Sequence, residues 1–276
     1  MSDLFSSTED ITDVKFKDYS YHYLARSINS SSYLLNNYSQ WEKIKGKWYY
    51  FKEITAKLFS DVRFDSMKFL LNELLGVKLA NFWDLDTISY LIGKNENSFY
   101  LLSENFRNWS AEYFLADELD VPSFLYGNTG IENILNLRYV CPNKENYYHL
   151  LANLFKMFAL DFYSAQADRS STNMIFSKDK DSNISLCKAF DYEISFEKEL
   201  DLQSISNPFL DRGIEETQDF FYYFPTAYET FRLIAYIDLD KMLQDIIDEY
   251  NLNVPENLIE EYLTFDKERK ALVKQL

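Results

Sequence analysis

The chain has 276 residues, with 28 Lys+Arg against 44 Asp+Glu, a formal net charge of −16, and 47% of its residues are hydrophobic. This composition excludes intrinsic disorder and suffices for a large buried core. The negative charge argues against direct nucleic-acid binding, which needs clustered Lys and Arg. Two cysteines and two histidines argue against a disulfide scaffold or a zinc site. Without a signal peptide or a run of about 18 apolar residues, we expect a cytoplasmic protein with no membrane span.

The first part of the chain predicts strands and one helix. Residues 1–15 are polar and are expected to be frayed. A hairpin is predicted at 41–52, turning near Gly46, and apolar residues at helical spacing predict a helix over 64–82. Short strands are expected at 88–92 and 98–102. We therefore predict an N-terminal lobe over residues 1–112.

The second part of the chain predicts mainly helices. A strongly apolar helix is expected over 147–162, and two short strands at 173–176 and 186–190 flank a polar turn. One or two helices are expected within 220–250, the first starting near Pro225, and a last helix over 255–275. The whole pattern predicts an α+β, two-lobed fold with a β-rich N-terminal lobe and a mainly helical C-terminal lobe, residues 113–276.

Three polar residues flank the second predicted hairpin. Asp168 precedes Asn173 by five positions, and Asp191 follows the second strand. The helix–loop–hairpin order places all three at one end of the hairpin. Kinases need such a set, because an Asp positions the acceptor hydroxyl while an Asn and a second Asp hold Mg²⁺. The alternative for both acids is a structural role in a turn or a cap.

Lys52 and Glu73 supply the other half of the pattern. Lys52 ends an apolar, aromatic strand, and Glu73 lies twenty-one residues later on the predicted helix. A lysine on a buried strand is unusual unless it is paired. A strand lysine paired with a helix glutamate, reaching the nucleotide phosphates, is a kinase feature. The alternative is a lysine that carries its charge into solvent at a strand end.

With these residues in this order, the sequence resembles bacterial HipA-like Ser/Thr kinases, which belong to the protein-kinase-like superfamily that includes phosphatidylinositol 3- and 4-kinases. The similarity covers roughly residues 25–276. It rests on Tyr49-Tyr50-Phe51-Lys52, Asn72-Glu73-Leu74-Leu75-Gly76, Leu102-Ser103-Glu104-Asn105-Phe106, Phe158-Ala159-Leu160-Asp161, Gln166-Ala167-Asp168-Arg169 through Asn173-Met174-Ile175-Phe176, Ala189-Phe190-Asp191-Tyr192-Glu193-Ile194-Ser195 and the tail from Pro255.

The resemblance implies a two-lobed protein-kinase-like fold and an ATP- and Mg²⁺-dependent kinase that phosphorylates Ser or Thr of a protein. It implies that Lys52 contacts the nucleotide phosphates and Glu73 orients it. Asp168 is the implied catalytic base, and Asn173 and Asp191 are the implied Mg²⁺ ligands. The family's link to toxin–antitoxin systems suggests a regulatory partner protein.

The sequence departs from the family pattern at three places. Ser170 stands where the family usually has His, and Asp191 is followed by Tyr192-Glu193 and not by Phe-Gly. The loop 27–33 has no glycine, so phosphate contacts there are assigned to Ser30, Ser31 and Ser32 and to backbone N–H groups. These departures keep two alternatives open: a pseudokinase that binds a nucleotide or a partner, and a lipid or small-molecule kinase.

Two further segments have structural interpretations. The aromatic run 220–224 is expected in the core, with a docking surface as the alternative. The acidic run 193–201 is expected to be solvated surface, and it could select a basic substrate if it lies near the site.

Overall fold

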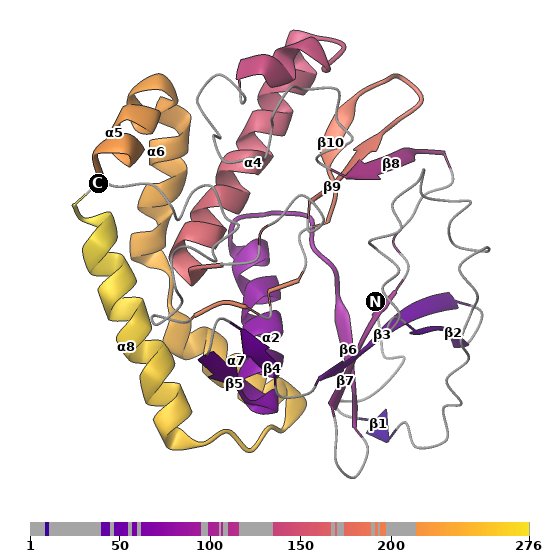
Figure 1. Cartoon of the computed structure of the whole chain (residues 1–276), viewed down its shortest axis with the longest axis vertical. Coiled ribbons are helices and arrows are strands. Elements are labelled where there is room, and N and C mark those ends of the chain that lie inside the picture. The colour runs from indigo at the N-terminus through magenta and orange to yellow at the C-terminus, as the bar shows by residue number, and fades with distance from the viewer. Residues whose placement is uncertain are drawn as a thin grey trace.

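A twisted sheet lies on one side of the molecule and a group of helices on the other (Figure 1). The computed structural model describes residues 9–10, 40–44, 47–54, 57–59, 62–94, 99–104, 106, 110–115, 135–166, 169, 174–188, 191–192, 194–196 and 214–275. Within these residues the combination of sheets and helices confirms the predicted α+β class.

Five of the described strands form one sheet in the order β1-β6-β7-β3-β2. Their bounds are β1 (Glu9–Asp10), β2 (Gln40–Ile44), β3 (Lys47–Ile54), β6 (Tyr90–Lys94) and β7 (Phe99–Glu104). The predicted hairpin is confirmed, since β2 and β3 pair antiparallel from Ile44 opposite Lys47. β6 and β7 also pair antiparallel, close to their predicted places. The expectation of a frayed start is wrong for β1, because its backbone pairs parallel with β6.

Helix α2 (Ser66–Phe82) confirms the predicted helical period and lies against the sheet and the other helices. It begins where the Asp65 side chain accepts a hydrogen bond from the Lys68 N–H at 2.7 Å. A short hairpin of β4 (Lys57–Phe59) and β5 (Val62–Phe64), absent from the sequence prediction, precedes it. Because α2 contacts β3 on one side and helices α4 (Lys144–Ser164) and α7 (Leu239–Tyr250) on others, most of its residues are buried.

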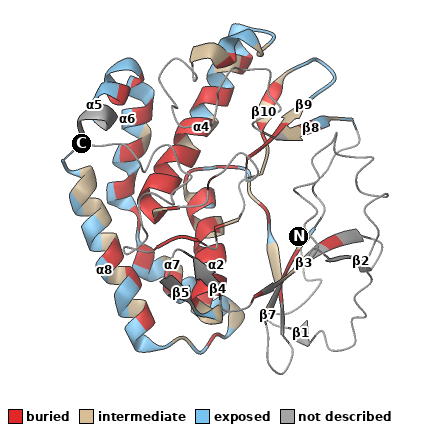
Figure 2. Cartoon of the chain, viewed as in Figure 1, coloured by how far each residue is buried: buried red, intermediate tan, exposed pale blue. Residues whose placement is uncertain are grey.

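Helix α4 is the other central element, and Figure 2 shows the buried residues concentrated on α2 and α4. It extends the helix expected at 147–162 by a few residues at each end. The Asn143 side chain caps its start by accepting from the Asn146 N–H at 2.8 Å. The helix ends at Ala165, whose φ of 49° lies in the left-handed region and turns the chain sharply.

A second sheet has three described strands, in the order β10-β9-β8. The predicted hairpin is confirmed as β9 (Ile175–Lys178) and β10 (Ile184–Leu186), with the second strand earlier than expected. β8 (Glu112–Leu115), which the sequence did not predict, pairs with the other edge of β9. The lobe boundary predicted after residue 112 therefore falls inside a strand that pairs with the second half of the chain, and the boundary stays a prediction.

The described C-terminal region, 214–275, consists of helices with short connections. They are α5 (Ile214–Tyr223), α6 (Pro225–Arg232), α7, α8 (Glu256–Val273) and the 3-10 helix η6 (Leu233–Tyr236). Pro225 starts α6 as predicted, but α5, α6 and α7 stand where one or two helices were expected. In the aromatic run, Phe220, Phe221 and Phe224 are buried, whereas Tyr222 and Tyr223 are exposed. No helix among the described residues is long and apolar enough to cross a membrane.

Candidate active site

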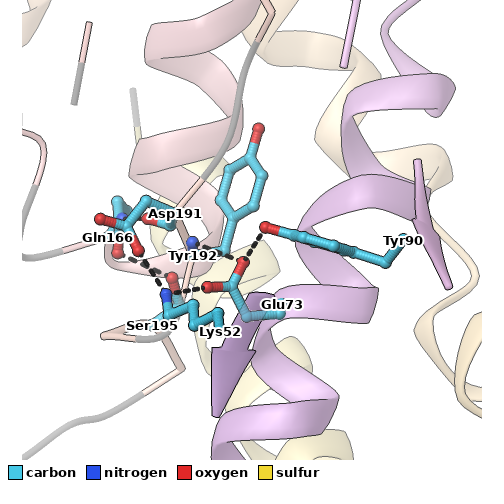
Figure 3. Close-up of polar contacts among 7 residues, drawn as sticks. All are labelled: Lys52, Glu73, Tyr90, Gln166, Asp191, Tyr192 and Ser195. Atoms are coloured by element: carbon cyan, nitrogen blue, oxygen red, sulfur yellow. Dashed lines mark hydrogen bonds and ion pairs between the residues drawn. The ribbon is translucent and has the colours of Figure 1, made fainter. Parts of the chain in front are cut away.

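Lys52 lies on β3, between β7 and β2, and its ammonium group contacts two acids. Its Nζ is 2.6 Å from Glu73 Oε1 and 2.7 Å from Asp191 Oδ1 (Figure 3). The Lys52 side chain is 18% exposed. One cation between two carboxylates leaves these three groups with one net negative charge, an arrangement that favours a further cation beside them.

Glu73 is fully buried on α2, and both of its oxygens are hydrogen-bonded. Oε1 accepts from Lys52, and Oε2 accepts from the Tyr90 hydroxyl at 3.0 Å and from the Tyr192 N–H at 3.1 Å. Burial, followed by the negative charge of Glu73, raises the pKa of Tyr90 well above its ordinary value, so its hydroxyl keeps the proton that it donates. These partners stabilise a carboxylate that would be costly to bury alone.

Asp191 is held through its side chain and through its backbone. Its φ of 62° lies in the left-handed region, which costs an L-residue roughly 1–2 kcal/mol. The peptide group between Asp191 and Tyr192 is fixed at both ends: its carbonyl accepts from Gln166 Nε2 at 2.5 Å, and its N–H donates to Glu73 Oε2. The Asp191 side chain remains 25% exposed, so its carboxylate contacts Lys52 and is also partly open to solvent.

Arg169, in the loop after α4, forms a buried ion pair with Asp161 on α4 and also contacts the Tyr192 ring beside Asp191. Arg169 Nε is 3.0 Å from Asp161 Oδ2, and its Nη2 is 3.1 Å from Asp161 Oδ1. Burial alone would lower the pKa of Arg169, but the Asp161 charge raises it, so the guanidinium stays charged. The guanidinium also lies 5.2 Å from the centre of the Tyr192 ring. Because Arg169 directly follows Asp168 and Tyr192 directly follows Asp191, this contact ties together the segments that carry two of the predicted site acids.

Gly76 lies on α2 where the Tyr192 side chain touches the helix. A Cβ at this position would be 2.1 Å from Tyr192 Cγ and 2.5 Å from Tyr192 Cβ. These atoms form the base of a fully buried side chain and cannot swing aside. Although alanine usually stabilises a helix relative to glycine, we expect Gly76→Ala to lower the free energy of unfolding by about 1–3 kcal/mol.

Urea unfolding measures this effect, and Asn81→Ala on the exposed side of α2 is the matched control. The control should leave stability unchanged or slightly higher. A Gly76→Ala variant as stable as the wild type would show that the contact with Tyr192 is not tight.

Of the residues predicted from the sequence, Lys52, Glu73 and Asp191 are brought into direct contact. Asp168, Asn173 and Ser30–Ser32 lie outside the described residues, so their places stay predictions. Gln166 and Met174, which bound the segment that contains Asp168 and Asn173, are both buried. The expectation of a solvated acidic run is wrong for residues 194–196, because their side chains pack in the interior; the rest of that run lies outside the described residues.

Sequence reasoning assigned no role to Tyr90, Gln166 or Ser195. Tyr90 starts a strand, and a tyrosine at the start of a strand does not by itself predict a hydrogen bond to a carboxylate. Gln166 donates to the Asp191 carbonyl and accepts from the Ser195 hydroxyl. A bond to a main-chain carbonyl cannot be recognised from the residue types, because every residue has that group. The one signal in the sequence is that Gln166 belongs to the Gln-Ala-Asp-Arg segment that resembles HipA-like kinases.

Solved structures of similar fold include a kinase. The chain is similar to the Helicobacter pylori proinflammatory kinase CtkA, with a TM-score of 0.58 and 12% identity over 96% of this chain and 94% of the other. It is also similar to a chain of the Shewanella oneidensis MR-1 toxin–antitoxin complex of HipA and HipB with operator DNA, with a TM-score of 0.56 and 10% identity over 97% of this chain and 73% of the other. No protein-family model matches the sequence, and no curated protein matches it.

The likeness confirms the predicted resemblance to HipA-like kinases at the level of the fold. At 10–12% identity it does not extend to a particular reaction. One of these structures is a complex that contains DNA. The absence of direct nucleic-acid binding, which the net charge of this chain favours, stays a prediction.

Proposed function

We propose that the chain is an ATP- and Mg²⁺-dependent kinase that transfers the γ-phosphate of ATP to a Ser or Thr hydroxyl of a protein. The observation that carries the proposal is the position of Lys52 Nζ. The backbone of Lys52 is fixed in the sheet, and its Nζ bonds to both Glu73 and Asp191. In a kinase-like fold, a strand lysine paired with a helix glutamate is the group that contacts the nucleotide phosphates.

The described residues fit a magnesium nucleotide. Mg²⁺ prefers oxygen ligands and keeps several waters; Asp191 offers carboxylate oxygens that are partly exposed, beside a cluster with net negative charge. We assign Asp191 and Asn173 to the metal and Lys52 to the phosphates, with Glu73 holding Lys52 in place. Bound Mg²⁺ would supply neutralisation of the phosphate charge. The residues around it orient the nucleotide, since phosphoryl transfer depends mainly on positioning and electrostatics.

The remaining assignments come from the sequence. Asp168 would accept the proton of the acceptor hydroxyl and orient it, and Ser30, Ser31 and Ser32 would contact the phosphates. The N-terminal lobe, 1–112, would hold the nucleotide, and the C-terminal lobe, 113–276, would carry the acids. The scarcity of cysteine and the use of ATP favour the cytoplasm. One similar fold comes from a complex with a partner protein, HipB, and we propose that a partner protein regulates this chain.

Incubation of the purified chain with ATP labelled at the γ-phosphate tests the proposal. We expect label on Ser or Thr of the chain itself or of added proteins, in Mg²⁺ and not in excess EDTA. A thermal-shift titration with ATP and Mg²⁺ runs beside it. Binding without transfer would favour the pseudokinase, and label in lipid would favour a lipid kinase. The absence of both binding and transfer would overturn the proposal.

A further inference from the structure

A chain of buried hydrogen bonds runs from the C-terminal helix to the backbone of Asp191. On α8, the Tyr262 hydroxyl donates to Asn72 Oδ1 at 2.5 Å, and Asn72 Nδ2 donates to the Ser195 carbonyl at 2.9 Å. The Ser195 hydroxyl then donates to Gln166 Oε1 at 2.9 Å, and Gln166 Nε2 donates to the Asp191 carbonyl at 2.5 Å. Figure 3 shows the last of these residues around Asp191.

Each side chain of this relay is buried; Asn72, Ser195 and Gln166 are 0% exposed, and Tyr262 is 1% exposed. Water therefore does not compete for these bonds. The members come from α8, α2, the segment 194–196 and the second residue after α4, so the relay connects four parts of the fold.

The two amides can adopt only one orientation. Asn72 and Gln166 each face a backbone carbonyl with the amide nitrogen, and a flipped amide would place oxygen against oxygen. The hydroxyls of Tyr262 and Ser195 then donate to the two amide oxygens. All four donors point from α8 toward Asp191, so a change at Tyr262 is transmitted through defined partners.

We propose that Gln166 is a positioning residue that, with Ser195, Asn72 and Tyr262, holds the Asp191 peptide in its left-handed conformation and so directs the Asp191 carboxylate toward the divalent cation. That last step rests on the proposed function. Two hydrogen bonds fix the Asp191 peptide, one from Gln166 and one from the Tyr192 N–H to Glu73. Without the bond from Gln166, the Asp191 backbone relaxes from a left-handed conformation that an L-residue disfavours. The carboxylate then leaves its place beside Lys52.

Gln166→Ala tests the proposal, with Asn146→Ala as the matched control. Asn146 is also a buried amide, in the first turn of α4, and it donates to the Ile184 carbonyl at 2.8 Å while accepting from the Ile184 N–H at 3.0 Å. Both variants lose a buried amide with two hydrogen bonds, so both should lose similar stability. Only the Gln166 variant loses a bond to Asp191.

Two measurements separate the variants. In hydrogen exchange, Gln166→Ala should speed exchange of the Tyr192 amide by about tenfold, the effect of one lost buried hydrogen bond, whereas Asn146→Ala should speed exchange in β10. In an ATP thermal-shift titration, Gln166→Ala should raise the half-saturating Mg²⁺ concentration by about tenfold, and Asn146→Ala should not change it. Tyr262→Phe, which removes only the first donor, should shift both quantities in the same direction by about two- to threefold.

Unchanged Tyr192 exchange in Gln166→Ala would overturn the positioning role, even if the wild type is a kinase. A faster Tyr192 amide with an unchanged Mg²⁺ requirement would overturn the link to the metal. If the wild type binds no ATP with Mg²⁺, the proposed function fails, and the exchange of the Tyr192 amide alone supports or overturns the positioning of Asp191.

Discussion

Asp191→Ala is expected to reduce phosphate transfer by at least about 10²–10³-fold, the usual cost of removing a group that stabilises charge at the reacting phosphate. The chain should stay folded. The Asp191 side chain is 25% exposed, and after the substitution Lys52 keeps its contact with fully buried Glu73. No buried charge is therefore left unpaired. The free energy of unfolding should change by no more than about 1 kcal/mol. Transfer of labelled phosphate and urea unfolding measure the two quantities.

The control for this variant is Asp86→Ala. Asp86 also pairs with a lysine, Lys188, at 2.6 Å, but its side chain is 68% exposed. The control should keep both wild-type transfer and wild-type stability. If Asp191→Ala retains transfer near the wild-type rate, the assignment of Asp191 to the metal is wrong, whatever the fold resembles.

Lys52 and Glu73 could be found from the sequence because a charged lysine conflicts with its aromatic strand and an acid follows on the next helix. A lysine on an aromatic strand needs a partner, and the order of strand and helix made Glu73 the candidate. The structure places them 2.6 Å apart. Hydrophobic period likewise predicted α2 and α4, whose burial extends over most of their length.

The backbone conformation of Asp191 could not be predicted in this way. Its left-handed φ depends on a bond from Gln166, twenty-five positions earlier, to a carbonyl that every residue type possesses. β8 was missed for a related reason, because its pairing with β9 is set by a partner far along the chain. Residues 194–196 lie in an acidic stretch of sequence that predicts exposure to solvent, yet tertiary packing buries these three residues.

Arg169→Met is expected to lower the free energy of unfolding by about 3–5 kcal/mol, because it leaves the Asp161 carboxylate buried without its partner. Both residues are almost fully buried, at 1% and 0% side-chain exposure, so solvent cannot compensate for the loss. Urea or guanidinium unfolding measures the change. A loss below about 1 kcal/mol would show that Asp161 is protonated or solvated without the arginine.

The double variant Arg169→Met/Asp161→Leu separates stability from positioning. Replacing a buried ion pair by apolar residues of similar volume is often neutral or stabilising, so we expect most of the lost stability to return. Phosphate transfer should stay low, because methionine cannot reproduce the guanidinium contact at 5.2 Å from the Tyr192 ring that links the residue after Asp168 to the residue after Asp191. Recovery of both stability and transfer would mean that the ion pair only fills space. Recovery of stability alone would show that Arg169 positions Asp168 and Asp191 relative to each other. This role is expected because Arg169 follows Asp168 in the sequence and contacts Tyr192, the residue after Asp191.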